Sequence, residues 1–219
     1  MKIFLDTANS EAIEQWSYLI DGITTNPTLL AKEKNNPTQQ IKKICSLMKD
    51  KEVSVEITEK NPQAVYDQAK KIAQLAPHVV VKIPCYAAYY PIIKKLVEEN
   101  IPLNITLLFS LSQGLFMSKL GVRYISPFVG RIDDIDGDGI ELLYRLREMI
   151  DRYGYQTQIL AASLRHLQHL HNAIGAGADV ATIPPELLTK ATKHILTEQG
   201  MELFEIDWKK LGTPHFPEL

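Results

Sequence analysis

The chain has few cysteines and little excess of charge of either sign. Only two of its 219 residues are cysteine, Cys45 and Cys85, and they lack the spacing of a metal-binding pair. Two cysteines in a chain of this size do not make a disulfide framework, so we expect a cytoplasmic protein. A formal net charge of −2 offers no basic surface, so we expect no nucleic-acid partner, and any phosphate must be bound by local groups.

Long apolar runs and flexible linkers are also missing. The first apolar run reaches Asp6 after three residues, which is too early for the apolar core of a signal peptide. No other run approaches the roughly 20 residues that cross a bilayer, so we expect no membrane partner. Hydrophobic residues make up 45% of the chain, enough for one large core, and no Gly/Ser-rich segment divides it. We therefore predict one domain over residues 1–219.

Short β-branched runs alternate with longer amphipathic segments. The predicted strands are KIFLD (2–6), GITTN (22–26), VSVEI (53–57), VVVKI (79–83), LNITLL (103–108), RYISPF (123–128), TQILAAS (157–163) and VATI (180–183). The predicted helices are 10–19, 38–48, 62–75, 89–99, 110–120, 139–153, 164–174 and 186–197, the sixth capped by Asp138. Repeated strand–helix units require parallel strands, and eight units favour a single (β/α)8 TIM barrel over an open sheet.

One face of the predicted strands is polar. Because alternate strand residues point to opposite faces, the apolar set should contact the helices: Leu5, Val55, Val81, Ile105 and Ile125. The other set should point into the barrel: Asp6, Asn26, Glu56, Lys82, Asn104, Thr106, Ser126 and Ser163. These residues come late in their strands, where barrel enzymes gather catalytic groups. Taken singly, each could instead cap the following helix.

Lys82 stands out because its strand, VVVKIP, is otherwise apolar. Removal from water disfavours an ammonium ion, so a buried lysine can present the neutral amine that imine formation requires. The alternative is a lysine that extends to solvent from the strand end. Asp6 and Glu56 could carry protons for such chemistry, or either could simply pair with Lys82.

Seven segments in chain order resemble the small transaldolases, a family of class I Schiff-base aldolases. They are FLDTAN (4–9), TTNPTLL (24–30), VSVEIT (53–58), VVVKIP (79–84), LNITLLFS (103–110), ISPFVGRIDD (125–134) and LAASLRH (160–166). The resemblance implies a barrel with the Schiff-base lysine at Lys82 on its fourth strand. It also implies that Asp6 is the acid/base and that Glu56 and Thr106 hold the water that makes and hydrolyses the imine.

The same resemblance implies the substrate contacts and the reaction. Asn26, Asn104 and Ser126 match positions that bind the dihydroxyacetone unit, and Arg131, Ser163 and Arg165 match the phosphate site. Arg165 could also be a solvated residue of the first helical turn. The expected reaction needs no cofactor: it moves dihydroxyacetone from sedoheptulose 7-phosphate or fructose 6-phosphate to glyceraldehyde 3-phosphate or erythrose 4-phosphate, in the pentose phosphate pathway.

Two positions separate this activity from its nearest rival in the family, fructose 6-phosphate aldolase, which releases free dihydroxyacetone. Those aldolases resemble this chain but carry Gln where Glu56 stands and Tyr where Phe128 stands. Both residues here are those of the transferase, with Phe128 placed at the substrate. A third reading, from another functional class, is a non-catalytic barrel that binds sugar phosphates without forming an imine.

Two segments resemble metal-binding motifs, but each lacks a required ligand. The segment DDIDGDG begins like a calcium loop, but Arg145 stands where a bidentate Glu is needed. In RHLQHLH only His166 and His169 share a helical face, and no third ligand is evident, so we expect a surface helix and no metal.

The C-terminal segment, about 199–212, carries apolar residues beyond the eight units. Such a segment needs a partner surface. In the family resembled here, this helix packs on a neighbouring subunit in pentamers or decamers, so we expect a homo-oligomer; a tail folded on its own barrel is the alternative.

Overall fold

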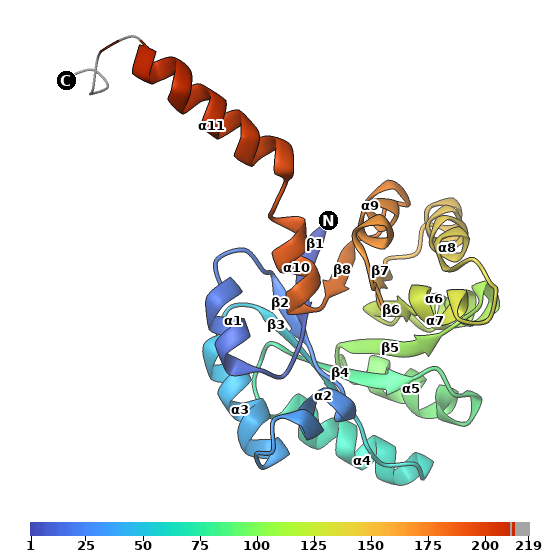
Figure 1. Cartoon of the computed structure of the whole chain (residues 1–219). Helices are drawn as coiled ribbons and strands as arrows, with labels where there is room; N and C mark the ends of the chain where they lie inside the picture. Colours follow the sequence, from blue (N-terminus) through green and yellow to red (C-terminus); the bar gives the residue numbers. More distant parts are fainter. Residues whose placement is uncertain (211, 213–219) are drawn as a thin grey trace.

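The computed structural model describes residues 1–210 and 212, and eight parallel strands close into a barrel in chain order (Figure 1). β1 pairs with both β2 and β8, which completes the ring. The strands are β1 (Lys2–Asp6), β2 (Gly22–Thr24), β3 (Glu52–Glu56), β4 (Val79–Pro84), β5 (Leu103–Leu108), β6 (Tyr124–Pro127), β7 (Gln158–Ala161) and β8 (Val180–Ile183). The predicted (β/α)8 barrel is confirmed.

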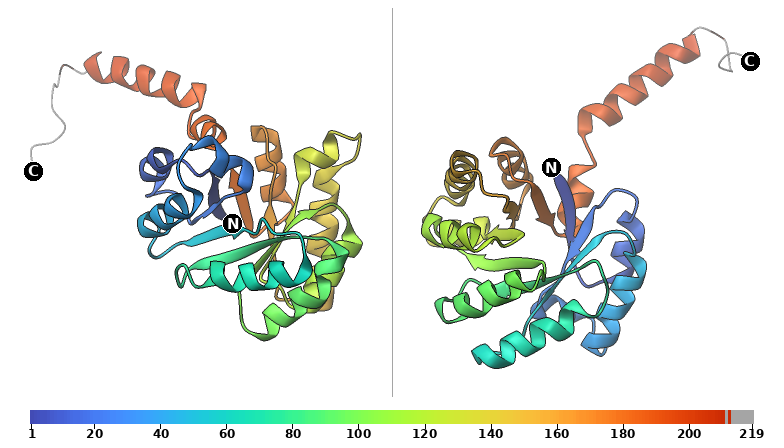
Figure 2. Two further views of the ribbon diagram at one scale, coloured as in Figure 1. Left: turned by 90° about the horizontal axis from the view of Figure 1, so that it is seen from below. Right: turned by 180° about the vertical axis from the view of Figure 1, so that it is seen from behind.

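Helices surround this barrel on its outer side (Figures 1 and 2). Those of the eight predicted units are α1 (Ser10–Trp16), α3 (Pro37–Leu47), α4 (Pro62–Ala73), α5 (Tyr90–Glu98), α6 (Leu111–Leu120), α8 (Gly139–Tyr153), α9 (Leu167–Gly175) and α10 (Pro185–Ala191). The sequence-based prediction missed three short elements: α2 (Pro27–Lys32), α7 (Val129–Asp133) and the 3₁₀ turn η1 (Ala87–Tyr89). All three follow the carboxyl end of a strand: α2 follows β2, η1 follows β4 and α7 follows β6.

Side-chain caps fix where several helices begin. The predicted cap of α8 is present, because the Asp138 carboxylate accepts a hydrogen bond from the Glu141 amide at 2.8 Å. Asn26 caps α2 in the same way, with Pro27 in the first turn. β2 therefore ends at Thr24, two residues before the predicted end, and Asn26 belongs to a helix cap.

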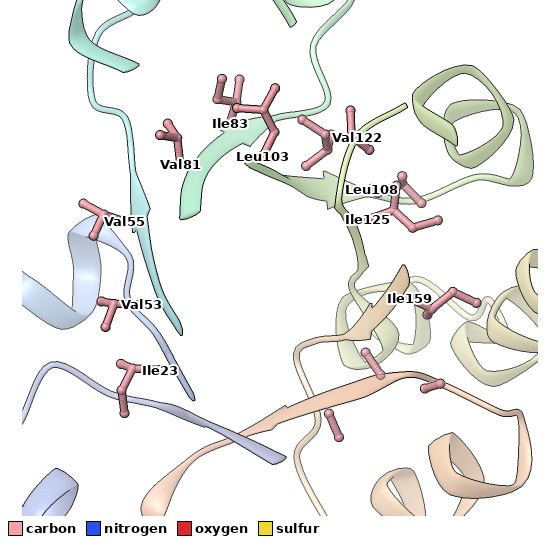
Figure 3. Packing of buried hydrophobic residues seen from close by; sticks show 14 of the residues in the cluster. Ile23, Val53, Val55, Val81, Ile83, Leu103, Leu108, Val122, Ile125 and Ile159 are labelled. Atoms are coloured by element: carbon pink, nitrogen blue, oxygen red, sulfur yellow. The ribbon is translucent and has the colours of Figure 1, made fainter. Parts of the chain in front are cut away.

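The apolar set of strand residues packs against the helices, as the alternation predicts. Leu5, Val55, Val81, Ile105 and Ile125 are all buried in one large cluster that also contains helix residues. Figure 3 shows Val55, Val81 and Ile125 pointing away from the barrel axis. The residues between them must point into the barrel, because successive strand side chains lie on opposite faces.

A second apolar cluster lies inside the barrel, and two of its members, Leu160 and Ala162, reach the smaller of the two cavities described below. It consists of Phe4, Val80, Tyr124, Leu160, Ala162 and Val180. Several members stand two residues before a polar residue on the same face: Phe4 precedes Asp6, Val80 precedes Lys82, and Tyr124 precedes Ser126. The interior is therefore layered, with an apolar plug beneath a polar layer.

Tyr124 anchors the plug. Its ring meets Phe4 edge-to-face at 6.2 Å, and its hydroxyl donates to Glu52 at 2.5 Å. Glu52 also pairs with Arg123. Burial, together with the hydrogen bond to Glu52, raises the pKa of Tyr124 to about 12, so the phenol keeps its proton. The plug leaves the polar layer to face the opposite, carboxyl end of the strands.

The chain ends in a long helix that leaves the barrel. α11 (Ile195–Lys210) extends outward from α10 (Figures 1 and 2), and none of its residues is buried. It starts before the predicted boundary near 199, and Leu211, in the predicted helix, lies outside the described residues. Across residues 1–210 and 212, the helices fall short of the length and apolar character of a membrane span.

Candidate active site

Lys82 and Glu56 form the centre of the polar layer. The two residues are direct partners in the register of β3 and β4, so their side chains point to the same side of the sheet. Lys82 Nζ lies 3.2 Å from a Glu56 carboxylate oxygen and donates to the Thr25 carbonyl at 3.3 Å. Only 5% of Lys82 is exposed. A lysine that reaches bulk solvent from its strand end is therefore ruled out.

Asp6 is oriented by a pair of threonines. The Thr24 hydroxyl donates to the Asp6 carboxylate at 2.7 Å and lies 2.6 Å from the Thr182 hydroxyl. These contacts join β1, β2 and β8 across the barrel interior. Neither threonine was among the predicted site residues, although both follow the inward alternation of their strands. Asp6 is thus held by uncharged groups, while Glu56 takes the ion pair with Lys82.

An amide and two hydroxyls form a chain on the opposite wall. Ser126 donates to the Asn104 carbonyl oxygen at 2.6 Å, and the Asn104 amide donates to the Ser54 hydroxyl at 3.2 Å. All three residues are buried. Asn104 is therefore fixed in one orientation by β3 and β6, and Ser54 is another site residue that the sequence-based prediction missed.

Thr106 carries a buried hydroxyl that has no hydrogen-bond partner among the described residues. A buried polar atom without a partner costs about 1–3 kcal/mol, so such atoms generally meet water or a ligand. The next residue, Leu107, has a left-handed backbone with φ of 52°, and the register between β5 and β6 shifts at this point. The pairing of β5 with β6 is therefore interrupted at the carboxyl end of β5, beside the site.

Two adjoining cavities open above these groups. The larger, of about 400 Å³, is lined by Asn26, Pro27, Thr28, Leu29, Glu56, Lys82, Thr106, Leu107, Phe128 and Arg131. The smaller, of about 170 Å³, is lined by Asp6, Thr24, Asn26, Lys82, Ser126, Phe128, Arg131, Leu160, Ala162, Ser163 and Thr182. Lys82 lines both. Of the predicted site residues, only Asn104 and Arg165 do not line either cavity, and Asn104 bonds directly to Ser126, which does.

Phe128 and Arg131 form part of the wall that the two cavities share. The Phe128 ring packs edge-to-face on the Phe109 ring, with 5.9 Å between the ring centres. The Arg131 guanidinium lies 5.5 Å from the centre of the Phe128 ring. Asn26 also lines both cavities, and its side-chain oxygen accepts a hydrogen bond from the Leu29 amide at 2.9 Å.

Arg165 lies outside the cavities. It is exposed, and its guanidinium donates to both carboxylate oxygens of Asp134, in one case at 2.6 Å. The Arg165 hydrogen bond holds the pKa of Asp134 below its usual range. The three residues predicted to bind phosphate are therefore not all at the cavity. Arg131 and Ser163 line it, whereas Arg165 lies outside it in an ion pair with Asp134.

The histidine segment differs from the predicted surface helix. His166 caps α9, and the His169 ring is buried against Asp133. Within residues 1–210 and 212, no three His, Cys, Asp or Glu side chains gather in a way that could hold a metal ion.

A closed parallel barrel with a buried lysine and two carboxylates at the carboxyl ends of its strands is the architecture of a (β/α)8-barrel enzyme. The chain belongs to the transaldolase/fructose-6-phosphate aldolase family, whose model matches residues 3–213. The class and the family predicted from the sequence are thus confirmed.

Relatives match over nearly the full chain. A probable transaldolase of Maricaulis maris is 45% identical over 214 residues, covering 97% of this chain and 98% of its own. A probable transaldolase of Lactiplantibacillus plantarum is also 45% identical, over 95% of this chain and 97% of its own. Probable transaldolase 2 of Listeria monocytogenes is 44% identical, over 95% of this chain and 96% of its own.

Two threonines of the polar layer should respond differently to the same replacement. We expect Thr24→Val to lower the free energy of unfolding by about 1–3 kcal/mol, because it removes the partner of Asp6 and Thr182. Thr106→Val should leave it unchanged or raise it, since that hydroxyl bonds to no described group and a buried hydroxyl without a partner is itself costly. Urea unfolding measures both, and equal losses would show that Thr106 has a structural role.

Proposed function

We propose that the chain is a transaldolase that moves a dihydroxyacetone unit from a ketose phosphate to an aldose phosphate through an imine at Lys82. The observation that carries this proposal is a buried lysine amine on the wall of both cavities, with Glu56 at 3.2 Å and Asp6 lining the smaller cavity. The names of the relatives, probable transaldolase, support it. We assign no cofactor to the reaction, because the imine nitrogen itself accepts electrons.

Imine formation comes first. The Lys82 amine attacks C2 of the ketose, and the resulting carbinolamine loses water to give the protonated imine. Glu56 is the group that accepts the lysine proton, since its carboxylate already contacts Nζ. Glu56 and the Thr106 hydroxyl then hold the water that is released here and used again in hydrolysis. The missing partner of Thr106 Oγ1 fits this role.

Asp6 controls the carbon–carbon bond. Its carboxylate takes the proton of the C4 hydroxyl, C4 becomes an aldehyde, and the C3–C4 electron pair moves into the imine to give an enamine. The aldose phosphate leaves. When an acceptor aldehyde arrives, the enamine carbon attacks it and Asp6 returns the proton to the new hydroxyl. Thr24 keeps the carboxylate aimed at the cavity through its 2.7 Å hydrogen bond.

The remaining polar groups hold the substrate. We assign Asn26, Asn104 and Ser126 to the dihydroxyacetone unit, where the Ser126–Asn104 hydrogen bond of 2.6 Å presets both side chains. We assign the phosphate to Arg131 and Ser163 at the smaller cavity, with Arg165 alongside. Asp134 occupies part of the five-donor guanidinium fork of Arg165, so a phosphate must share that group with a carboxylate.

Fructose 6-phosphate aldolase is the rival function within the family. Phe128 at the wall shared by both cavities favours transfer, because a phenyl ring cannot hydrogen-bond a water that would release the bound enamine as dihydroxyacetone. We place the reaction in the pentose phosphate pathway and in the cytoplasm. Two buried, free thiols, Cys45 and Cys85, are compatible with a reducing compartment.

Reductive trapping tests the proposed function. The chain is incubated with fructose 6-phosphate and borohydride, and we expect an adduct on the peptide that contains Lys82. Lys82→Met should abolish the adduct and turnover, whereas Lys94→Met, at an exposed lysine of α5, should leave both unchanged. An unmodified Lys82 peptide, or full turnover in Lys82→Met, would overturn the proposal.

Transfer and cleavage are separated by Phe128→Tyr. We expect at least a several-fold rise in dihydroxyacetone released from fructose 6-phosphate without an acceptor, because the new phenol can activate water at the enamine. Phe109→Tyr is the matched control, since it adds the same hydroxyl to the neighbouring ring outside the cavities. Coupled detection of glyceraldehyde 3-phosphate measures release, and equal rates in both variants would contradict this account of Phe128.

The outer helix supports a homo-oligomer. Along α11, Met201, Leu203, Phe204 and Ile206 are each more than half exposed, with Phe204 at 74%. Exposed apolar surface on this scale favours burial against a second copy. We propose that the barrel is the catalytic unit and that α11 packs on a neighbouring subunit, in a pentamer or decamer. The alternative of a tail folded onto its own barrel is contradicted for residues 195–210.

Disrupting the apolar side of α11 should dissociate the assembly. We expect Phe204→Asp to lower the molar mass in solution toward that of one chain, because a carboxylate cannot be buried there without a partner. Gln199→Asp adds the same charge at an exposed polar position of the helix and should keep the oligomer. Size-exclusion chromatography with light scattering gives the mass, and an unchanged oligomer in Phe204→Asp would exclude this interface.

A further inference from the structure

A buried histidine lies behind the loop that carries Ser163 and Arg165. Only 7% of His169 is exposed, and its Nε2 lies 2.8 Å from an oxygen of Asp133. Its other ring nitrogen, Nδ1, accepts a hydrogen bond from the backbone amide of Arg165 at 3.3 Å. The ring therefore joins α9, the loop after β7, and the end of α7.

These contacts determine the state of the ring. Nδ1 can accept only without a proton, so the hydrogen is on Nε2 and is donated to Asp133. Burial is the main cause that lowers the pKa of His169, with His166 contributing, and Asp133 opposes the shift. The neutral ring is thus the form that fits both contacts.

Asp133 and Asp134 tie the same loop from the other side. The second oxygen of Asp133 accepts from the Gly139 amide at 3.0 Å, which fixes the carboxylate at the start of α8. Asp134 holds the Arg165 guanidinium. Arg165 is therefore held at its backbone through His169 and at its side chain through Asp134.

A backbone hydrogen bond joins the loop after β6 to the loop that carries Ser163 and Arg165. The Gly130 amide donates to the Ser163 carbonyl at 3.1 Å, directly before Arg131. A Cβ at Gly130 would lie 2.5 Å from that carbonyl, so only glycine permits the approach. Ser163 itself has a left-handed backbone with φ of 58°, a strained conformation that its surroundings must maintain.

We propose that His169 and Asp133 are positioning residues that hold Ser163, Arg165 and, through Gly130, Arg131 in place to bind the substrate phosphate. The inference rests on the proposed function. Neither His169 nor Asp133 lines the two cavities beside Lys82, so the pair sets the affinity for phosphorylated substrates and not the chemistry at Lys82. It makes the chain selective for phosphorylated over unphosphorylated sugars.

Two replacements of His169 separate its two contacts. An asparagine oxygen can stand in for Nδ1 and keep the Arg165 amide bonded, whereas a glutamine amide can stand in for Nε2 and keep only Asp133. We expect His169→Gln to raise the KM for fructose 6-phosphate roughly tenfold, the effect of one lost hydrogen bond, with kcat within about threefold. His169→Asn should recover most of the KM, and His171→Gln, at an exposed histidine of α9, should change nothing.

An unphosphorylated ligand provides the decisive comparison. Dihydroxyacetone reaches Lys82 without a phosphate, so its half-saturating concentration for borohydride trapping should stay within about twofold in His169→Gln. An equal rise for dihydroxyacetone and fructose 6-phosphate, a fall in kcat at unchanged KM, or no advantage of Asn over Gln would each overturn the proposal. If His169→Gln does not fold, Asp133→Asn should give the same selective rise, because an amide donor facing Nε2 moves the ring proton to Nδ1 and so removes the acceptor of the Arg165 amide, while the Asn oxygen keeps the Gly139 contact.

Inorganic phosphate keeps this inference distinct from the proposed function. Calorimetry with phosphate alone should show weaker binding to His169→Gln than to the unchanged chain, and equal binding would overturn the positioning role. If the unchanged chain gives no Lys82 adduct, the proposed function fails, while the phosphate result still decides the role of His169.

Discussion

The site depends on an ion pair that is placed inside the barrel, where a charge is costly. Lys82 and Glu56 lie 3.2 Å apart with little exposure, and neither could be accommodated there without the other. Strand register creates the pair, because Glu56 and Lys82 are direct partners on β3 and β4. Two hydrophobic side chains at these positions would make the fold at least as stable, so stability does not explain the ion pair. Its physical role is to hold an amine beside the cavity, where it can react.

Everything around the pair follows from alternation along the strands. Outward residues such as Val81 pack on the helices, while inward residues pass from the plug at Val80 to the site at Lys82 within two positions. The plug closes one end of the barrel, and the loops after the strands shape the other. The same sheet therefore supplies stability on its outer face and a polar, enclosed site on its inner face.

The alternation of strand residues predicts the barrel, most of the inward set and the place of Lys82. Ser163 was wrongly placed on a strand: β7 ends at Ala161, and Ser163 reaches the smaller cavity from the loop that follows. The sequence does not predict contacts between distant segments, since Thr24 with Thr182 and Arg165 with Asp134 depend on the closed fold. Asn26 was assigned to a strand although the Asn-Pro pair is a helix-start signal. His169 was expected at the surface, because a helical pattern alone does not reveal the carboxylate that faces it.

The central claim is that the Lys82 amine bonds covalently to a sugar carbon while Asp6 and Glu56 move the protons. A crystal structure of the chain soaked with fructose 6-phosphate tests it most directly. The account predicts continuous electron density from Lys82 Nζ to C2 of the sugar, with Glu56 released from its 3.2 Å contact toward water. A sugar bound in the cavity with the Lys82–Glu56 pair intact and no covalent link would contradict it.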